Sequence, residues 1–294
     1  MTRFAYVNGR YEHHDMAAVS IEDRGYQFAD GVYEVVAIWK GSAVDLKPHM
    51  DRLERSMSEL EFRNTPKRSS LGVIAKEVVR VNRVQTGILY IQINRGTAPR
   101  NHPFPAGEIN CSVVMTVRHG LGPSVSEIQN GVALKVQDDQ RWQRRDIKSI
   151  GLLANVLAKQ AAKSSGAFEA LLIDPDGTVT ESSAANVWLV DQDGTLVTRP
   201  LGSEILGGIT RARVMSIASD AGYSTKEAVF TLDEVLSARE VFLTGTTTFV
   251  LPVVNVDHAV IANGHPGNTS CDLRDRYQSY LASLKPRPSW HVSE

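Results

Sequence analysis

The sequence predicts an α+β protein of two domains. Its 294 residues suit one large domain or two medium ones, because a domain commonly holds about 100–200 residues. Strand-like alternation and helical spacing occur in both halves, and hydrophobic periodicity is lost from about residue 119. We therefore expect a small N-terminal α+β domain over 1–119, a linker over 120–131, a larger C-terminal domain over 132–284 and a frayed tail over 285–294.

The N-terminal part combines strand signals with helical spacing. Asn8-Gly9 is a two-residue hairpin signal between short alternating segments. Further along, Met50, Leu53 and Met57 recur at the spacing of one helix face. The expected elements are strands at 4–7, 10–11, 32–39, 43–46, 88–93 and 111–117 and helices at 50–60 and 71–81.

The C-terminal part alternates strands with turns. Asp-Gly or Asn-Gly pairs at 176–177, 193–194 and 263–264 are typical of hairpin turns. The expected elements are strands at 132–136, 170–173, 187–190, 196–198, 228–230 and 241–244 and helices at 150–162, 210–221 and 273–284.

The balance of charge excludes two classes of function. Lys+Arg number 32 and Asp+Glu 33, giving a net charge of -1, whereas binding to nucleic acid or to an anionic membrane needs a basic surface. One short basic cluster at 141–145 leaves a nucleic-acid module as a remote alternative. We therefore expect no nucleic-acid or membrane partner and a small-molecule role.

Cysteines and hydropathy indicate the compartment. Cys111 and Cys271 are too few for a disulfide framework or a multi-cysteine metal site. No apolar run approaches the roughly 20 residues of a membrane span, and the N-terminus lacks the apolar core of a signal peptide. We expect a cytoplasmic protein with two buried thiols.

Lys148 is the first candidate for chemistry. It lies between Ile147 and Ile150, ahead of an almost charge-free helix. A desolvated amine has a lowered pKa and serves as a nucleophile or Schiff-base former. The alternative is a structural lysine whose amine reaches solvent.

Two loops and one glutamate extend this hypothesis. Gly207–Arg211 precedes a helix, where N–H groups bind anions, and Thr244–Thr248 offers hydroxyls after a strand. Both also suit ordinary turns. Glu181, among small residues, either caps a turn or pairs with a protonated ring nitrogen. Together these features favour a phosphate-bearing aldehyde cofactor.

Five runs in this order resemble the fold-type IV pyridoxal-phosphate enzymes. They are Glu22–Val35, Arg95–His102, Asp146–Ser149, Thr180–Val187 and Gly208–Arg211. The resemblance extends over nearly the whole chain and looks closest to the D-amino-acid transaminases. It implies a two-domain fold, with a β-barrel-like core in the larger domain and pyridoxal 5′-phosphate at the domain interface.

The resemblance implies a role for each matching residue. Lys148 matches the lysine that forms the internal aldimine and carries the proton between substrate Cα and cofactor C4′. Glu181 matches the partner of the pyridine nitrogen, and Arg52 matches the phosphate-binding arginine. The remaining implied cofactor contacts are Ile209, Thr210 and Thr246 to the phosphate and Leu206 to the ring.

Substrate binding is implied for another set of residues. Arg100 and His102 match a pair that captures the α-carboxylate from a loop of the neighbouring subunit, and Tyr33 helps orient that group. The expected protein is thus a homodimer. It would pass an amino group from a D-amino acid such as D-alanine to a 2-oxo acid such as 2-oxoglutarate, in a ping-pong reaction.

Three positions depart from the resemblance. Gly245 and Thr248 replace serines, and Ala184 replaces another. A lost hydroxyl near the phosphate costs on the order of 1 kcal/mol. The changed loop also resembles that of branched-chain and R-amine transaminases, so a branched-chain L-amino-acid transaminase and an R-selective amine transaminase are alternatives. An aminodeoxychorismate lyase, which shares the fold, is a third.

Overall fold

The computed structural model describes residues 3–284, so the predicted tail at 285–294 lies outside the described residues. The chain divides into two compact units. The first extends from the start of the described chain to Leu121 and includes Ile147–Gly151. The second consists of Gly122–Asp146 and Leu152–Ser283. The segment that carries Lys148 therefore belongs to the first unit, although the chain on both sides of it belongs to the second.

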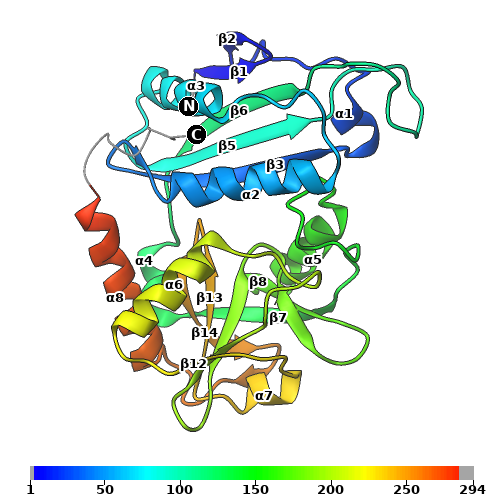
Figure 1. Cartoon of the computed structure of the whole chain (residues 1–294). Helices are drawn as coiled ribbons and strands as arrows, with labels where there is room; N and C mark the ends of the chain where they lie inside the picture. Colours follow the sequence, from blue (N-terminus) through cyan, green and yellow to red (C-terminus); the bar gives the residue numbers. More distant parts are fainter. Residues whose placement is uncertain (1–2, 285–294) are drawn as a thin grey trace. The chain divides into compact units, whose positions relative to one another are not determined.

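The first unit contains an antiparallel sheet of six strands in the order β2-β1-β6-β5-β3-β4 (Figure 1). Its central strands pair in continuous register, with Gly31 opposite Asn94 and Gly87 opposite His119. The predicted Asn8-Gly9 hairpin is confirmed. The strands are β1 (Phe4–Val7), β2 (Arg10–His13), β3 (Gly31–Trp39), β4 (Ser42–Ala43), β5 (Gly87–Asn94) and β6 (Ser112–His119).

Three helices accompany this sheet: α1 (Arg24–Phe28), α2 (Leu46–Glu59) and α3 (Arg68–Val81). The apolar stripes of α2 and α3 enter one core with β3, β5 and β6. The strand expected at 43–46 is too long: β4 ends at Ala43, and α2 begins at Leu46. Pro48 is tolerated in the first turn, where backbone N–H groups have no partner within the helix.

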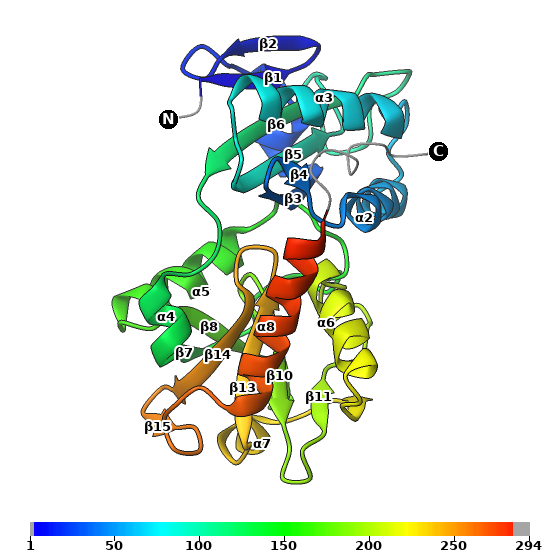
Figure 2. The same ribbon diagram turned by 90° about the vertical axis from the view of Figure 1, so that its left-hand side faces the viewer.

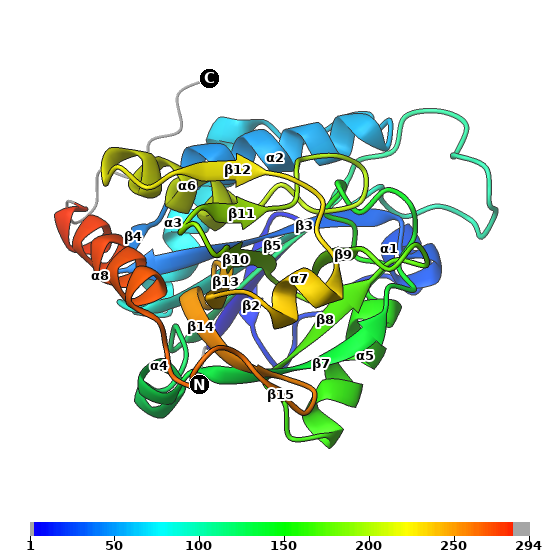
Figure 3. The same ribbon diagram turned by 90° about the horizontal axis from the view of Figure 1, so that it is seen from below.

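The second unit contains a curled sheet of nine strands (Figure 3). Its main path is β12-β11-β10-β13-β14-β7-β8-β9, with β15 paired to β14. β7 runs parallel to β8 and β14, and β11 parallel to β12, while the other pairs are antiparallel. The strands are β7 (Val132–Asp138), β8 (Glu169–Ile173), β9 (Val179–Ser182), β10 (Asn186–Val190), β11 (Leu196–Thr198), β12 (Thr225–Glu227), β13 (Glu240–Gly245), β14 (Phe249–Val256) and β15 (Ala259–Val260).

Helices cover parts of this sheet. α8 packs against β14 and α6 (Figure 2), and α5 packs against β7 and β8. α5 contacts the sheet through Ala158 and Ala162, while Leu153, Val156 and Leu157 are exposed. No helix within residues 3–284 is long and apolar enough to cross a membrane. The helices are α4 (Val125–Asn130), α5 (Leu153–Ser164), α6 (Ile209–Asp220), α7 (Leu232–Leu236) and α8 (Asn268–Ser283).

Local expectations in the second unit need correction. The strand expected at 228–230 is β12, which ends at Glu227 and pairs with β11. The hairpin expected at 263–264 turns instead at Asp257, whose positive φ of 53° allows the tight connection from β14 to β15. The stretch expected as a linker contains α4, which a capping box of Ser124 and Glu127 begins.

Candidate functional site

The backbone around Lys148 is attached to the first unit. The Tyr33 N–H donates to the Lys148 carbonyl at 3.0 Å, and Ser149 forms a bridge with Val32 on β3. On the other side, the Lys148 N–H lies 3.4 Å from Oγ of Ser56 on α2. Contacts to both β3 and α2 therefore hold this non-helical segment in place.

The amine of Lys148 lies beside an aromatic ring. Its Nζ is 4.3 Å from the centre of the Tyr33 ring, at a distance that permits a cation–π contact. Lys148 is half-buried, whereas its neighbour Ile147 is part of the first core. Tyr33 also packs against Tyr90, with ring centres 5.5 Å apart. The structure thus brings together two of the predicted site residues, Lys148 and Tyr33.

Arg52 is positioned by a buried carboxylate that the sequence analysis missed. Its Nε and one Nη each donate to Glu34 at 2.8 Å, and Nδ1 of His49 lies 2.7 Å from the same group. Burial alone would raise the pKa of Glu34, but Arg52 and His49 outweigh burial and hold it at about 2. A charged residue inside the apolar run at 32–39 was the available signal.

Arg100 and His102 lie together on the loop between β5 and β6, and both are exposed. The guanidinium carbon of Arg100 is 4.7 Å from the centre of the Phe28 ring, and the His102 ring is 5.3 Å from the same ring. This exposed cationic and imidazole pair can meet an anion that approaches from solvent.

Glu181 lies on β9 and is buried, with 4% of its surface exposed. It accepts hydrogen bonds from Nη1 of Arg141, from Nδ2 of Asn186 at 2.8 Å and from the Leu206 N–H at 3.2 Å. Burial raises the pKa of Glu181, and Arg141 opposes that effect. Glu181 is therefore a buried hydrogen-bond acceptor, and its ionised form is stable only beside cationic groups such as Arg141.

The basic cluster at 141–145 is neutralised inside the second unit. Arg141 donates through Nε and Nη2 to Asp139, and Arg145 pairs with Asp139 and Asp174. Arg144 pairs with Asp146. Because its three arginines are paired in this way, the cluster does not support the nucleic-acid alternative. The pairs also show that Arg141, which sequence reasoning missed, supports Glu181.

The start of α6 is close to Glu181. Asn186 donates to the Leu206 carbonyl at 2.9 Å as well as to Glu181. Gly208 is the N-cap of α6 and makes no side-chain cap hydrogen bond; a Cβ there would meet Oδ1 of Asn186 at 2.0 Å. Ile209 and Thr210 form the first turn, where N–H groups have no partner within the helix. The structure thus groups four predicted residues: Glu181, Leu206, Ile209 and Thr210.

The turn after β13 has little space for larger residues. A Cβ on Gly245 would lie 3.0 Å from Oγ1 of Thr248 and 3.3 Å from the Cβ of Ala185. Thr246, predicted to contact phosphate, is half-buried in this turn. The crowding gives a packing reason for glycine in place of serine at position 245.

Comparison with known proteins identifies the family. Residues 31–256 match the family model of amino-transferase class IV. The chain belongs to the class IV aminotransferases, which confirms the predicted family.

Individual relatives refine this comparison. The chain is 41% identical to D-alanine aminotransferase of Bacillus licheniformis over 94% of this chain and 96% of that protein. It is 36% identical to D-alanine aminotransferase of Staphylococcus haemolyticus, over 95% and 98% of the two chains. Among solved structures, the T.th. branched-chain amino acid aminotransferase with pyridoxamine 5′-phosphate has a TM-score of 0.88 at 27% identity, over 99% and 97%. The fold-type IV prediction is confirmed.

The donor groups suit pyridoxal 5′-phosphate, the cofactor of this class. The start of α6 suits a phosphate, because the N–H groups of its first turn have no partner within the helix and its N-cap Gly208 provides no side-chain cap. The buried carboxylate of Glu181 suits a protonated ring nitrogen. The amine of Lys148 suits an aldehyde. Each of these groups, taken within its own unit, therefore suits one part of the cofactor.

Proposed function

We propose that this protein transfers an amino group from a D-amino acid such as D-alanine to a 2-oxo acid such as 2-oxoglutarate, by a ping-pong reaction. The observation that carries the proposal is the exposed pair Arg100 and His102, on a loop fixed against α1. The identity to two D-alanine aminotransferases supports the choice of donor.

We propose pyridoxal 5′-phosphate as the cofactor. Arg52 and the start of α6, at Ile209 and Thr210, would bind its phosphate together with Thr246. Glu181 would pair with the ring nitrogen, and Leu206 would pack on the ring. When bound, the cofactor supplies an aldehyde for the amino group and a ring that withdraws electrons from the substrate Cα.

The chain's own residues would orient the substrate and move its proton. Arg100 and His102 bind the α-carboxylate, and Tyr33 orients it. Lys148 would carry the proton between the substrate Cα and the cofactor C4′, from Cα in the first half of the reaction and back to Cα in the second. Its half-buried amine, next to the Tyr33 ring, supports this role.

We propose a homodimer in the cytoplasm, in which Arg100 and His102 serve the partner's substrate. Their exposure in the single chain supports donation to a second copy. Cys111 and Cys271 are free thiols, in agreement with a reducing compartment, although both are half-buried rather than fully buried as expected. Burial raises the pKa of Cys111 to about 11.

The lysine is tested by replacement. Lys148→Ala should reduce the turnover of D-alanine with 2-oxoglutarate by at least 10³-fold, because no other amine is assigned to carry the proton. The reaction is followed by pyruvate release, and circular dichroism checks the fold. Turnover within tenfold of the wild type would contradict the proposal.

A branched-chain L-amino-acid transaminase is the second candidate. The similarity to the solved branched-chain enzyme favours it, since that protein has 27% identity and nearly the same fold. The two candidates differ in the handedness of the donor that they accept.

A further inference from the structure

The loop that carries Arg100 and His102 is held by a buried arginine of α1. Nη1 of Arg24 donates to the Asn101 carbonyl at 2.6 Å, and Nη2 donates to the His102 carbonyl at 3.1 Å. Arg24 is 3% exposed, although the loop residues that it binds are exposed. A buried guanidinium therefore fixes two consecutive carbonyls of an exposed loop.

The same arginine reaches the side chains through one ring. Its guanidinium carbon lies 4.9 Å from the centre of the Phe28 ring. Arg100 lies 4.7 Å from that ring, and the His102 ring is 5.3 Å away. Arg24 thus touches the backbone of the loop directly and supports the ring against which both side chains rest.

A half-buried carboxylate, that of Asp30, orients Arg24 and links it to a second arginine. Oδ2 of Asp30 accepts from Nε of Arg24 and from Nε of Arg95, each at 2.8 Å. The other donors of Arg95 bind the carbonyls of Leu60 and Glu61. Through Asp30, the loop is connected to the residues that follow α2.

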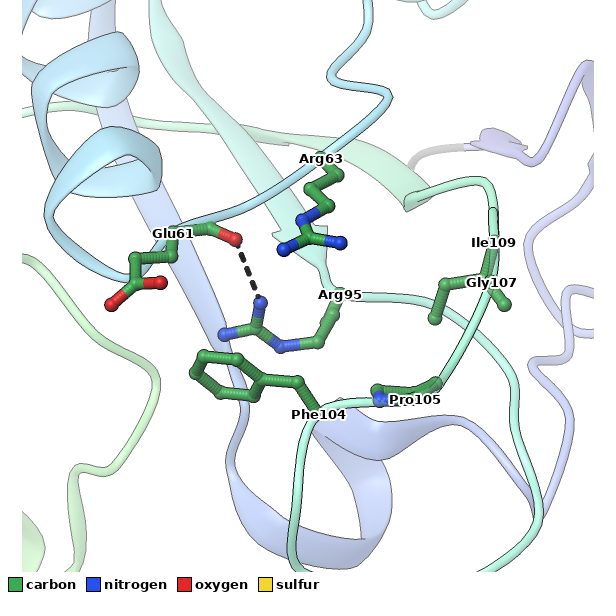
Figure 4. A pocket seen from close by; sticks show the side chains of 7 residues that line it. All are labelled: Glu61, Arg63, Arg95, Phe104, Pro105, Gly107 and Ile109. Carbon is green, nitrogen blue, oxygen red and sulfur yellow. Dashed lines mark hydrogen bonds between the residues drawn. The ribbon is translucent and has the colours of Figure 1, made fainter.

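The far side of the loop lies beside Arg95 and a cavity. Phe104 covers the guanidinium of Arg95, with 3.7 Å between its ring centre and the guanidinium carbon, and it lines a cavity of about 200 Å³ (Figure 4). Arg63 lines the same cavity and is exposed. The two hydrogen bonds from Arg24 therefore lie at the end of the loop that carries Arg100 and His102, and the cavity lies on its other side.

We propose that Arg24, oriented by Asp30, is a positioning residue that presents Arg100 and His102 to the substrate carboxylate. This inference rests on the proposed function. Without the two donors of Arg24, the loop would sample conformations in which the pair is misplaced, and each binding event would have to order it again. The cost falls on substrate binding rather than on the chemical step.

The test uses Arg24→Met in the holoenzyme, with Arg63→Met as the matched control. The control removes the same charge beside the same loop, but within residues 3–284 no loop carbonyl depends on that side chain. Arg24→Met should fold, because Arg95 still pairs with Asp30. Arg24→Lys is the second variant. It keeps a cation beside Asp30, but its single nitrogen replaces the three nitrogens with which Arg24 binds Asp30 and the two loop carbonyls.

We expect Arg24→Met to raise the KM for D-alanine about tenfold, with kcat and the visible spectrum of the bound cofactor within twofold of the wild type. Arg24→Lys should be intermediate and Arg63→Met unchanged. Backbone hydrogen exchange in residues 99–104 should accelerate at least fivefold in Arg24→Met alone. A fall in kcat at unchanged KM, or unchanged exchange in this loop, would overturn the proposal.

The exchange measurement needs no substrate. If the wild type fails to use D-amino acids, the proposed function is wrong, while faster exchange in Arg24→Met still supports the hold of Arg24 on the loop. If the wild type turns over D-alanine and Arg24→Met leaves KM unchanged, only the positioning role is lost.

Discussion

Each unit contains a buried glutamate paired with an arginine, and the two carboxyl groups shift their pKa in opposite directions. Glu34 lies near three nitrogen atoms of Arg52 and His49, which hold its pKa at about 2. Glu181 receives one nitrogen of Arg141, whose other two bind Asp139, and burial raises its pKa. Both carboxyl groups are buried, so the different number of arginine and histidine contacts accounts for the opposite directions of the two pKa shifts.

This difference suits two roles. At neutral pH Glu34 is an anion that orients Arg52 within the first unit. Glu181 has a single arginine contact, so a protonated ring nitrogen would add a second cation next to it. The charge-assisted hydrogen bond between them would stabilise the ionised carboxylate. Replacing each carboxylate separately tests this contrast.

We expect the largest loss of folding stability when Glu34 is replaced. Glu34→Gln leaves Arg52 and His49 without their anion, and we expect a loss of about 3–5 kcal/mol in the free energy of unfolding at neutral pH. Urea denaturation measures it. Glu77→Gln, at an exposed pair with Arg80, is the control and should cost less than about 1 kcal/mol. Equal losses in the two variants would contradict the role of Glu34.

The same ion pair predicts a pH dependence. The folded pKa of about 2 lies below the ordinary 4.5, so the pair stabilises the fold above about pH 4.5 and this contribution disappears as the pH falls toward 2. Glu34→Gln should therefore flatten the acid limb of the stability curve. Glu181 has a raised pKa, so its contribution to the stability of the fold changes with pH in the opposite direction. Burying this carboxyl group costs least free energy when the pH is low enough to protonate it.

The smaller effect is expected at Glu181, and in catalysis rather than in folding. Glu181→Gln removes a charge-assisted hydrogen bond to the ring nitrogen worth about 1.5–3 kcal/mol, so kcat should fall roughly 10- to 150-fold. The cofactor-free variant should lose less stability than Glu34→Gln, because Arg141 still binds Asp139. Steady-state kinetics and urea denaturation separate the two readouts; a kcat within threefold of the wild type would count against the pairing.

Short-range patterns in the sequence predicted much of the fold. The Asn8-Gly9 hairpin and the apolar spacing of α2 and α3 depend on neighbours along the chain, and both were found. The strand β14 was missed. It contains Pro252, which lacks a donor and lies just before Val253, the first residue that pairs with β7.

Long-range charge pairs could not be predicted in this way. Glu34 pairs with Arg52 and Arg141 with Glu181, 18 and 40 residues apart, and Arg24 binds the Asn101 carbonyl 77 residues away. Sequence reasoning assigned Arg141 to a basic cluster, since its acidic partners are not all adjacent to it. Family motifs pointed to Lys148 and Glu181 as candidates, and the structure adds the groups that contact them.

The central claim is transamination of a D-amino acid, and handedness tests it most directly. Purified wild-type protein is supplied with D-alanine or L-leucine at equal concentration, each with 2-oxoglutarate and pyridoxal 5′-phosphate, and glutamate formation is measured. We predict rapid turnover of D-alanine and at most one hundredth of that rate with L-leucine. Faster turnover of L-leucine would contradict the account and favour the branched-chain alternative.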